Sequence, residues 1–166
     1  MHASGVKRRH RVVRLSESAS VDLRRVMERE RASGLLSRVM LLAPEDQWLL
    51  DQHLGHGRAI AEIARQIGRS PSSLRERVRR LIGRIESPAY GLALTGVSSW
   101  DATARACVLA CVGRGISMRR AARELGIGEH VVRARMREFA WTLRLMAERE
   151  RGAAAPGALI AKGVAA

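Results

Sequence analysis

The sequence contains an internal repeat, and this feature limits what the chain can fold into more than any other. Shifting the sequence by 58 positions aligns residues 47–81 with residues 105–139 without a gap. Eight aligned pairs are identical: Gly55/Gly113, Gly57/Gly115, Ala64/Ala122, Arg65/Arg123, Gly68/Gly126, Arg75/Arg133, Arg77/Arg135 and Arg79/Arg137. Apolar residues coincide at further positions, such as Leu74/Val132. An arginine-rich chain produces arginine matches easily, but the glycines and the apolar spacing indicate a duplicated module.

The first copy predicts three helices. Pro44 at the opening position and acids in the first turn start a helix, which the glycines at 55 and 57 end. A short helix over 59–67 follows and closes at Gly68, and Ser70 caps a third helix that opens with Pro71 and ends near residue 87. The apolar stripes of the second and third helices are Ile60, Ile63, Ala64, Ile67 and Leu74, Val78, Leu81, Ile85.

The second copy repeats this plan. We expect Ser98 to cap a helix that runs through Val112, Ser117 to cap a short helix to Leu125, and a long helix to cover about residues 129–151. Upstream of both copies, the apolar spacing predicts an amphipathic helix over about residues 16–32 and a second helical segment over 35–42.

Together these patterns predict an all-α protein with tandem helix-turn-helix modules of three helices each and an N-terminal helical extension. Only 3% of residues are aromatic while 46% are hydrophobic, which favours packed helices over a β-sandwich or barrel. The linker is apolar, so we expect it to pack against one or both modules. The predicted segments are a disordered basic arm (1–14), the helical extension (15–42), the first module (43–86), the linker (87–97), the second module (98–151) and a disordered tail (152–166).

Positive charge is concentrated in three segments. The chain has a formal net charge of +14. Residues 1–14, 58–86 and 114–151 each carry a net charge of +5, and the remainder is close to neutral. The basicity therefore belongs to the N-terminal arm and to the two modules, which favours a polyanionic partner.

The second and third helices of each copy have the pattern of a helix-turn-helix. The pattern is carried by Ala64, Gly68 and Leu74, and again by Ala122, Gly126 and Val132. The alanines sit where two helices cross, and a larger side chain there would push the backbones apart. The glycines permit the positive φ that ends a helix in a turn. The leucine and valine attach the third helix to the core, so that its other face is left to enter a major groove.

The two helix-turn-helix segments resemble a known family. The stretches AEIARQIGRSPSSLRERV (61–78) and AARELGIGEHVVRARM (121–136) resemble the region 4 domain of bacterial sigma factors, which binds the promoter −35 element. They are also similar to the LuxR-type regulator domain. The resemblance covers about 35 residues per copy, roughly 70 of 166, and implies helix-turn-helix DNA binding in a bacterial transcription protein.

The sequence also departs from that family. The residues before the first module include no Phe, Trp or Tyr and are too few for the promoter-melting region of a sigma factor, so a complete sigma factor is not expected. Position 69 is arginine where the turn usually buries an aliphatic residue, which Ile127 supplies in the second copy. Gly128 replaces the usual Ser or Thr cap.

The early, outward face of each third helix supplies the candidate DNA-binding residues. They are Ser70, Ser72, Ser73, Arg75, Glu76 and Arg79 in the first copy, and Glu129, His130, Arg133 and Arg137 in the second. Arginine binds guanine with two hydrogen bonds and glutamate accepts from cytosine, each good pair being worth about 1–3 kcal/mol in discrimination. Arg77 and Arg135 lie nearer the core, and we expect them to pair with phosphate or an acid. The arm either adds phosphate or minor-groove contacts or is a disordered tail.

Other functional classes find little support. The longest uncharged stretch, 87–100, is too short and too rich in Pro, Gly and Ser to span a membrane, and the basic N-terminus lacks the apolar core of a secretory signal. His53, His56, Cys107 and Cys111 are of types that bind zinc, but core packing explains the cysteines better. We therefore predict no metal, no cofactor and no catalytic site, in a reduced, cytoplasmic protein.

The predicted function is sequence-specific binding of double-stranded DNA by a transcriptional regulator, through occlusion or recruitment. The alternative is a sigma-like adaptor that contacts RNA polymerase or a partner regulator through residues 16–42. A third, weaker hypothesis is the DNA-binding subunit of a phage packaging or recombination machine. A homo-oligomer is compatible with each of them.

Overall fold

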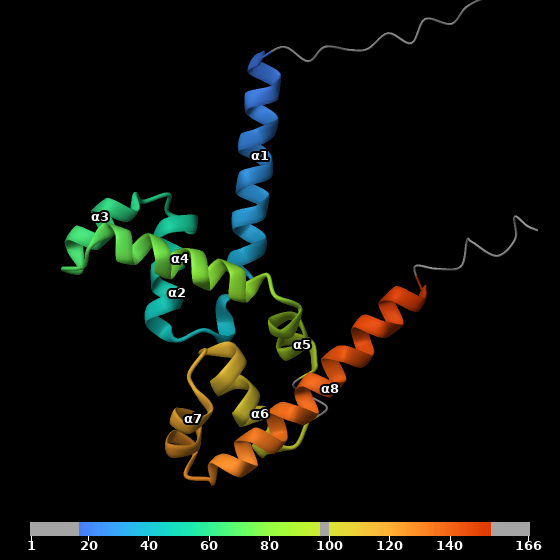
Figure 1. Ribbon diagram of the computed structural model, residues 1–166. Coiled ribbons are helices and arrows are strands. Elements are labelled where there is room, and N and C mark those ends of the chain that lie inside the picture. The colour runs from blue at the N-terminus through green and yellow to red at the C-terminus, as the bar shows by residue number, and fades with distance from the viewer. Residues whose placement is uncertain (1–16, 97–99, 154–166) are drawn as a thin grey trace, which may run out of the picture.

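A computed structural model describes residues 17–96 and 100–153, and over these ranges every regular element is helical, with no strand (Figure 1). The arm predicted to be disordered, residues 1–14, lies outside the described residues. The predicted disordered tail lies outside them too, except at Gly152 and Ala153. These two residues belong to the last helix, so the prediction was wrong for them.

Two elements precede the repeat. Helix α1 spans Glu17–Leu36 and the 3-10 helix η1 spans Val39–Leu41. The sequence predicted a break near residue 33, but α1 continues through it because Leu35 in its last turn is buried in the first core. Figure 1 shows α1 extending away from the other helices.

The first repeat, α2 to α4, is followed by a bridging helix and the second repeat, α6 to α8. The first repeat consists of α2 (Pro44–Leu50), the π-helical turn η2 (Asp51–Gly55), α3 (Ile60–Gln66) and α4 (Pro71–Ile85). Helix α5 (Pro88–Gly96) comes next. The second repeat consists of α6 (Ala102–Val108), the π-helical turn η4 (Leu109–Gly113), α7 (Met118–Leu125) and α8 (Glu129–Ala153).

The backbone reproduces the sequence repeat with the same offset. Each element of the second repeat begins 58 positions after its counterpart in the first. Even the π-helical turns correspond, and both are followed by a glycine with positive φ, 67° at Gly57 and 68° at Gly115. The repeat is therefore structural as well as compositional.

Local capping chemistry explains where several helices begin. The Ser70 hydroxyl accepts a hydrogen bond from the Ser73 amide at 3.2 Å, and the Ser117 hydroxyl accepts from the Arg120 amide at 3.3 Å, as predicted. The cap of α6 was predicted wrongly, since Asp101 holds that position and accepts from the Ala104 amide at 2.8 Å. Ser98 lies outside the described residues.

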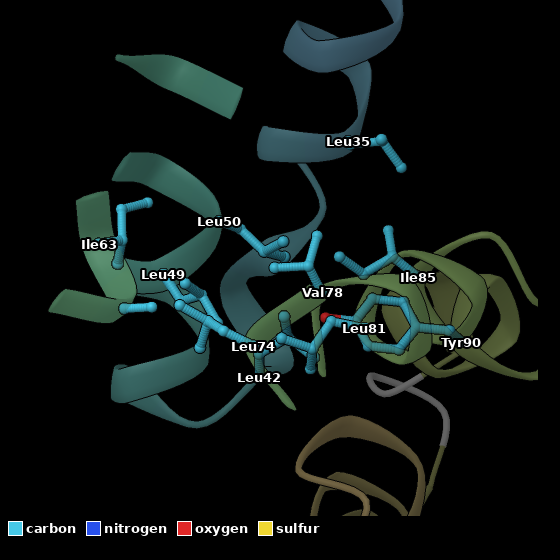
Figure 2. Close-up of a cluster of buried hydrophobic side chains, with 11 residues drawn as sticks. Leu35, Leu42, Leu49, Leu50, Ile63, Leu74, Val78, Leu81, Ile85 and Tyr90 are labelled. Atoms are coloured by element: carbon cyan, nitrogen blue, oxygen red, sulfur yellow. The ribbon is translucent and has the colours of Figure 1, made fainter. Parts of the chain in front are cut away.

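The first core joins α1, η1, the first repeat and α5 (Figure 2). Its buried side chains come from Leu35, Leu42, Leu49, Leu50, Ile63, Ala64, Leu74, Val78, Leu81, Ile85 and Tyr90. The Tyr90 hydroxyl donates to the carbonyl oxygen of Arg38 at 2.8 Å, and burial raises the pKa of this phenol. This bond ties α5 to the segment before η1.

The second repeat is built on smaller side chains, and α5 connects it to the first. Its core contains Cys107, Ala110, Ala121, Ala122 and Val132. A third cluster joins Leu92 and Ala93 of α5 to Val108 and Phe139. The apolar linker is therefore a helix, which the sequence did not predict, and it packs against both repeats as expected.

Two tryptophans and one isoleucine are exposed. Trp48, Trp141 and Ile67 are 39%, 63% and 39% exposed, although Ile67 belongs to a predicted apolar stripe. Trp100 makes an edge-to-face contact with Phe139, with 5.4 Å between the ring centroids. The apolar spacing placed these residues on helices but did not determine which neighbours would cover them.

Candidate nucleic-acid interface

The connection between the last two helices has the same geometry in both repeats. Gly68 has φ 65° and Gly126 has φ 66°, and the amide that follows each glycine closes the turn: Arg69 N–H donates to the Ala64 carbonyl at 2.9 Å, and Ile127 N–H to the Ala122 carbonyl at 3.1 Å. Both alanines are buried, as the turn pattern required. Each turn therefore fixes the helix that follows it.

Helix α4 exposes one face along its first turns. Leu74 and Val78 are buried in the first core, so the opposite face is left to solvent. All six candidates of the first copy are exposed: Ser70, Ser72, Ser73, Arg75, Glu76 and Arg79. The Ser70 hydroxyl also lies 3.3 Å from that of Ser72, so capping already uses part of this serine cluster.

The arginines of this face differ in how they are engaged. Glu76 forms ion pairs with Arg79 and, at 4.0 Å, with Arg80. Arg75 has no ion pair among the described residues. An incoming ligand can therefore contact the Arg75 guanidinium without breaking an existing ion pair.

Helix α8 presents the corresponding face, but the ion-paired and the unpaired arginine have exchanged positions relative to α4. Arg133 forms an ion pair with Glu129 at 2.7 Å, whereas Arg137 is exposed and unpaired within the described part of the chain. His130 is exposed and Glu129 is half-buried. A Cβ atom at position 128 would lie 2.5 Å from the ring of His130, an exposed side chain that would have to shift.

Arg77 and Arg135 both pair with acids, one of the two outcomes that the sequence left open. Arg77 binds Asp46 Oδ1 through Nε and Nη2, at 2.7 Å each, and so joins α4 to α2. Arg135 pairs with Asp101 at 3.1 Å and Glu138 at 2.9 Å, and these two carboxylates, Glu138 first, raise its pKa. Sequence reasoning missed Asp46 as a partner because 31 residues separate it from Arg77.

The two turns bury different amounts of the residue that follows the glycine. Ile127 is half-buried and packs against the second core, whereas its counterpart Arg69 is exposed. An open groove of about 530 Å³ lies beside Arg69, and its walls include Trp48 and Ile67. We attribute the exposure of these two apolar side chains to the missing aliphatic residue at position 69.

The metal ligand types in the sequence do not converge. Within residues 17–96 and 100–153, no group of three or more His, Cys, Asp and Glu side chains is placed to hold a metal ion. Cys107 is buried and Cys111 half-buried, both are free thiols, and burial raises the pKa of each. None of the helices described has the length and apolarity needed to cross a membrane.

A scan against protein-family models, a search of the curated proteins and a search of the solved structures each find no match to this chain. The candidate interface is defined by this chain's own residues, two exposed helix faces at corresponding positions of a structural repeat. Each face holds one engaged and one unengaged arginine, Arg79 and Arg75 on α4 and Arg133 and Arg137 on α8.

Proposed function

We propose that the protein binds double-stranded DNA sequence-specifically as a transcriptional regulator, with the two repeats acting as helix-turn-helix modules and with no catalytic step. One observation carries the proposal. The same turn occurs twice, 58 residues apart, and each time it is followed by a helix that buries one face and exposes the other. That arrangement suits α4 and α8 to lie in successive segments of the major groove.

The charges favour the same function. Residues 58–86 and 114–151 each carry +5, which favours phosphate contacts and gives affinity without sequence preference. Specificity then comes from base edges, and Arg75 and Arg137 are the side chains best placed for guanine because neither must first release an acid. Arg79 and Arg133 must first give up an ion pair with a carboxylate. A contact of either one with a base or phosphate therefore contributes less net binding free energy.

The experiment uses a duplex selected from a randomised pool or mapped on a genome. We expect Arg75→Ala and Arg137→Ala each to weaken binding to the selected site by tenfold or more, since one bidentate guanine contact contributes about 1–3 kcal/mol. Fluorescence anisotropy with a labelled duplex measures this loss. The matched control is Arg144→Ala, because Arg144 is an exposed arginine farther along α8 and outside the proposed face.

The pattern of losses separates the alternatives. Equal losses mean that both repeats contact bases, and loss from one variant alone assigns the other repeat to protein contacts. If neither substitution weakens binding beyond the Arg144→Ala control, the proposed interface is wrong.

A second candidate function, an adaptor for RNA polymerase or a partner regulator, is favoured by α1. Val26 and Met27 of this projecting helix are 49% and 67% exposed. Val26→Asp with Met27→Asp should abolish capture of polymerase or of the partner if this function holds, while DNA binding stays unchanged. A deletion through residue 42 is less suitable because it removes Leu35 and Leu42 from the first core.

A further inference from the structure

A small cationic pocket lies where the two repeats meet. Its volume is about 170 Å³, and its walls are formed by Arg77, Arg80, Leu81 and Arg84 of α4, by Asp46 of α2 and by Arg114, which follows η4. The pocket thus has room for one small anionic group with some water, and it is bounded by both repeats.

The positive charge of this pocket is compensated only in part, and Arg84 is the arginine left without an acid among the described residues. Four guanidinium groups face one carboxylate, Asp46, and both short contacts of that carboxylate are made by Arg77. Arg114 pairs with Glu124 at 2.7 Å, and Arg80 lies 4.0 Å from Glu76. Arg84 forms no ion pair with any described residue.

The backbone holds Arg84 at the junction. Its Nη1 donates to the carbonyl oxygen of Arg114 at 3.2 Å. A Cβ atom at position 115 would lie 2.2 Å from the guanidinium carbon of Arg84. A side chain at position 115 would occupy the space of the Arg84 head group, which lies across the start of that loop.

The second repeat serves as an internal control, because it has the same framework without the cluster. The counterparts of Arg80 and Arg84 are Glu138 and Thr142. Glu138 neutralises Arg135, which is the counterpart of Arg77. Concentrated positive charge is thus specific to the face of α4 that meets the second repeat and is not a consequence of the helix framework.

We propose that this pocket binds a phosphate group, and that the bound phosphate joins α4 of the first repeat to the Arg114 loop of the second. Arginine forks match the oxygens of phosphate, and an anion relieves the repulsion among the guanidinium groups. The phosphate comes either from a free phosphate compound or from the DNA backbone. Only the second source rests on the function proposed above.

The first experiment measures binding of inorganic phosphate to the full chain by isothermal titration calorimetry, with chloride keeping the ionic strength constant. We expect Arg84→Gln, and separately Arg80→Glu, to weaken phosphate binding at least tenfold. The second change places an acid where the second repeat has Glu138, at a side chain that is 68% exposed, so it keeps the fold intact. Arg144→Gln should bind phosphate like the unsubstituted chain.

The second experiment identifies the source. If the pocket holds a DNA phosphate, phosphate competes with duplex binding and Arg84→Gln lowers the salt-dependence slope by about one. If a free compound is the ligand, the chain still binds phosphate and that slope is unchanged.

The proposal is overturned if Arg84→Gln and Arg80→Glu alter neither phosphate binding nor the slope. Loss of phosphate binding in these variants, with no effect of Arg75→Ala or Arg137→Ala on DNA, would instead refute the DNA interface and leave the pocket standing.

Discussion

Single residues explain why two copies of one framework behave differently. Ile127 covers its core and Arg69 does not, and the open groove beside Arg69 is the result. In the same way, Glu138 neutralises Arg135, whereas the corresponding Arg80 adds charge to the junction. One substitution in a repeated turn or on a repeated face is enough to change what the copy presents to solvent.

Replacing Arg69 by isoleucine should make the first repeat more stable. The new side chain would pack beside Trp48 and Ile67, and partial burial of an aliphatic side chain contributes about 1 kcal/mol. Urea unfolding followed by circular dichroism measures the gain. The reciprocal control, Ile127→Arg, should destabilise by a similar amount, and an unchanged or lower stability of Arg69→Ile would contradict this explanation of the groove.

Asp101 should contribute to the acid sensitivity of the fold. The Ala104 amide, bonded at 2.8 Å, and then the Arg135 guanidinium at 3.1 Å, hold the pKa of Asp101 below its usual value. Because the folded-state pKa is the lower one, the ionised carboxylate stabilises the fold at neutral pH. This contribution is lost as the pH falls through the folded-state pKa.

Asp101→Asn tests this effect because asparagine still caps the helix but carries no charge. We expect a lower Tm at neutral pH and a smaller decrease in Tm between about pH 7 and pH 2.5, measured by scanning calorimetry. Glu28→Gln in the exposed part of α1 is the control. The same acid dependence in Asp101→Asn and in the unsubstituted chain would show that Asp101 contributes nothing.

At the scale of elements, the turn glycines position the helices that carry the candidate site. Gly68→Ala should cost about 1–2 kcal/mol, because its φ of 65° is unfavourable for a residue with a Cβ atom, although nothing lies within 4 Å of that atom. Urea unfolding measures this cost without a confounding clash.

Gly83→Ala is the matched control, since Gly83 lies inside α4 with no neighbour within 4 Å of a Cβ atom. Alanine there should stabilise by about 0.5–1 kcal/mol because it favours the helix. If Gly68→Ala and Gly83→Ala changed the free energy of unfolding in the same direction, the positive φ at Gly68 would not be the reason for glycine there.

The sequence predicted those elements whose signals are local. Ser70 with Pro71 and Ser117 determined helix starts through side-chain capping, and the 58-residue offset predicted the second repeat from the first. Helix α5 was missed because its Pro and Gly content indicated a linker, whereas burial of Leu92 and Ala93 against Val108 stabilises it. Long-range packing overrode local propensity there.

Contacts between segments distant in the sequence account for most of the rest. The exposure of Trp48 depends on residue 69 in the turn, and Arg77 finds its acid on another helix. The pocket at the junction needs Arg84 to meet a loop 30 residues away. No periodicity in the sequence predicts these contacts. The repeat alignment did show that the repeat fails at Arg80 and Arg84, which mark the junction. The DNA-contacting roles of the ten candidate residues stay predictions.

At the scale of the whole molecule, α5 makes one unit of the two repeats. Tyr90 is part of the first core, while Leu92 and Ala93 pack against the second repeat. Gly113 approaches η1 so closely that a Cβ atom would lie 2.6 Å from the Leu41 carbonyl oxygen. The mutual orientation of α4 and α8 is therefore set by direct packing.

The affinity of the full chain for duplex DNA as a function of salt concentration tests the central claim most directly. Two cationic helix faces that neutralise phosphates should release counterions, so a logarithmic plot should fall steeply, by about 0.9 per phosphate contacted. Arg75→Ala combined with Arg137→Ala should remove preference for the selected site with little change in that slope, because these two arginines are assigned to bases and not to phosphates. Affinity that does not change with salt, or no binding at about 50 mM salt, would contradict DNA binding by the repeats.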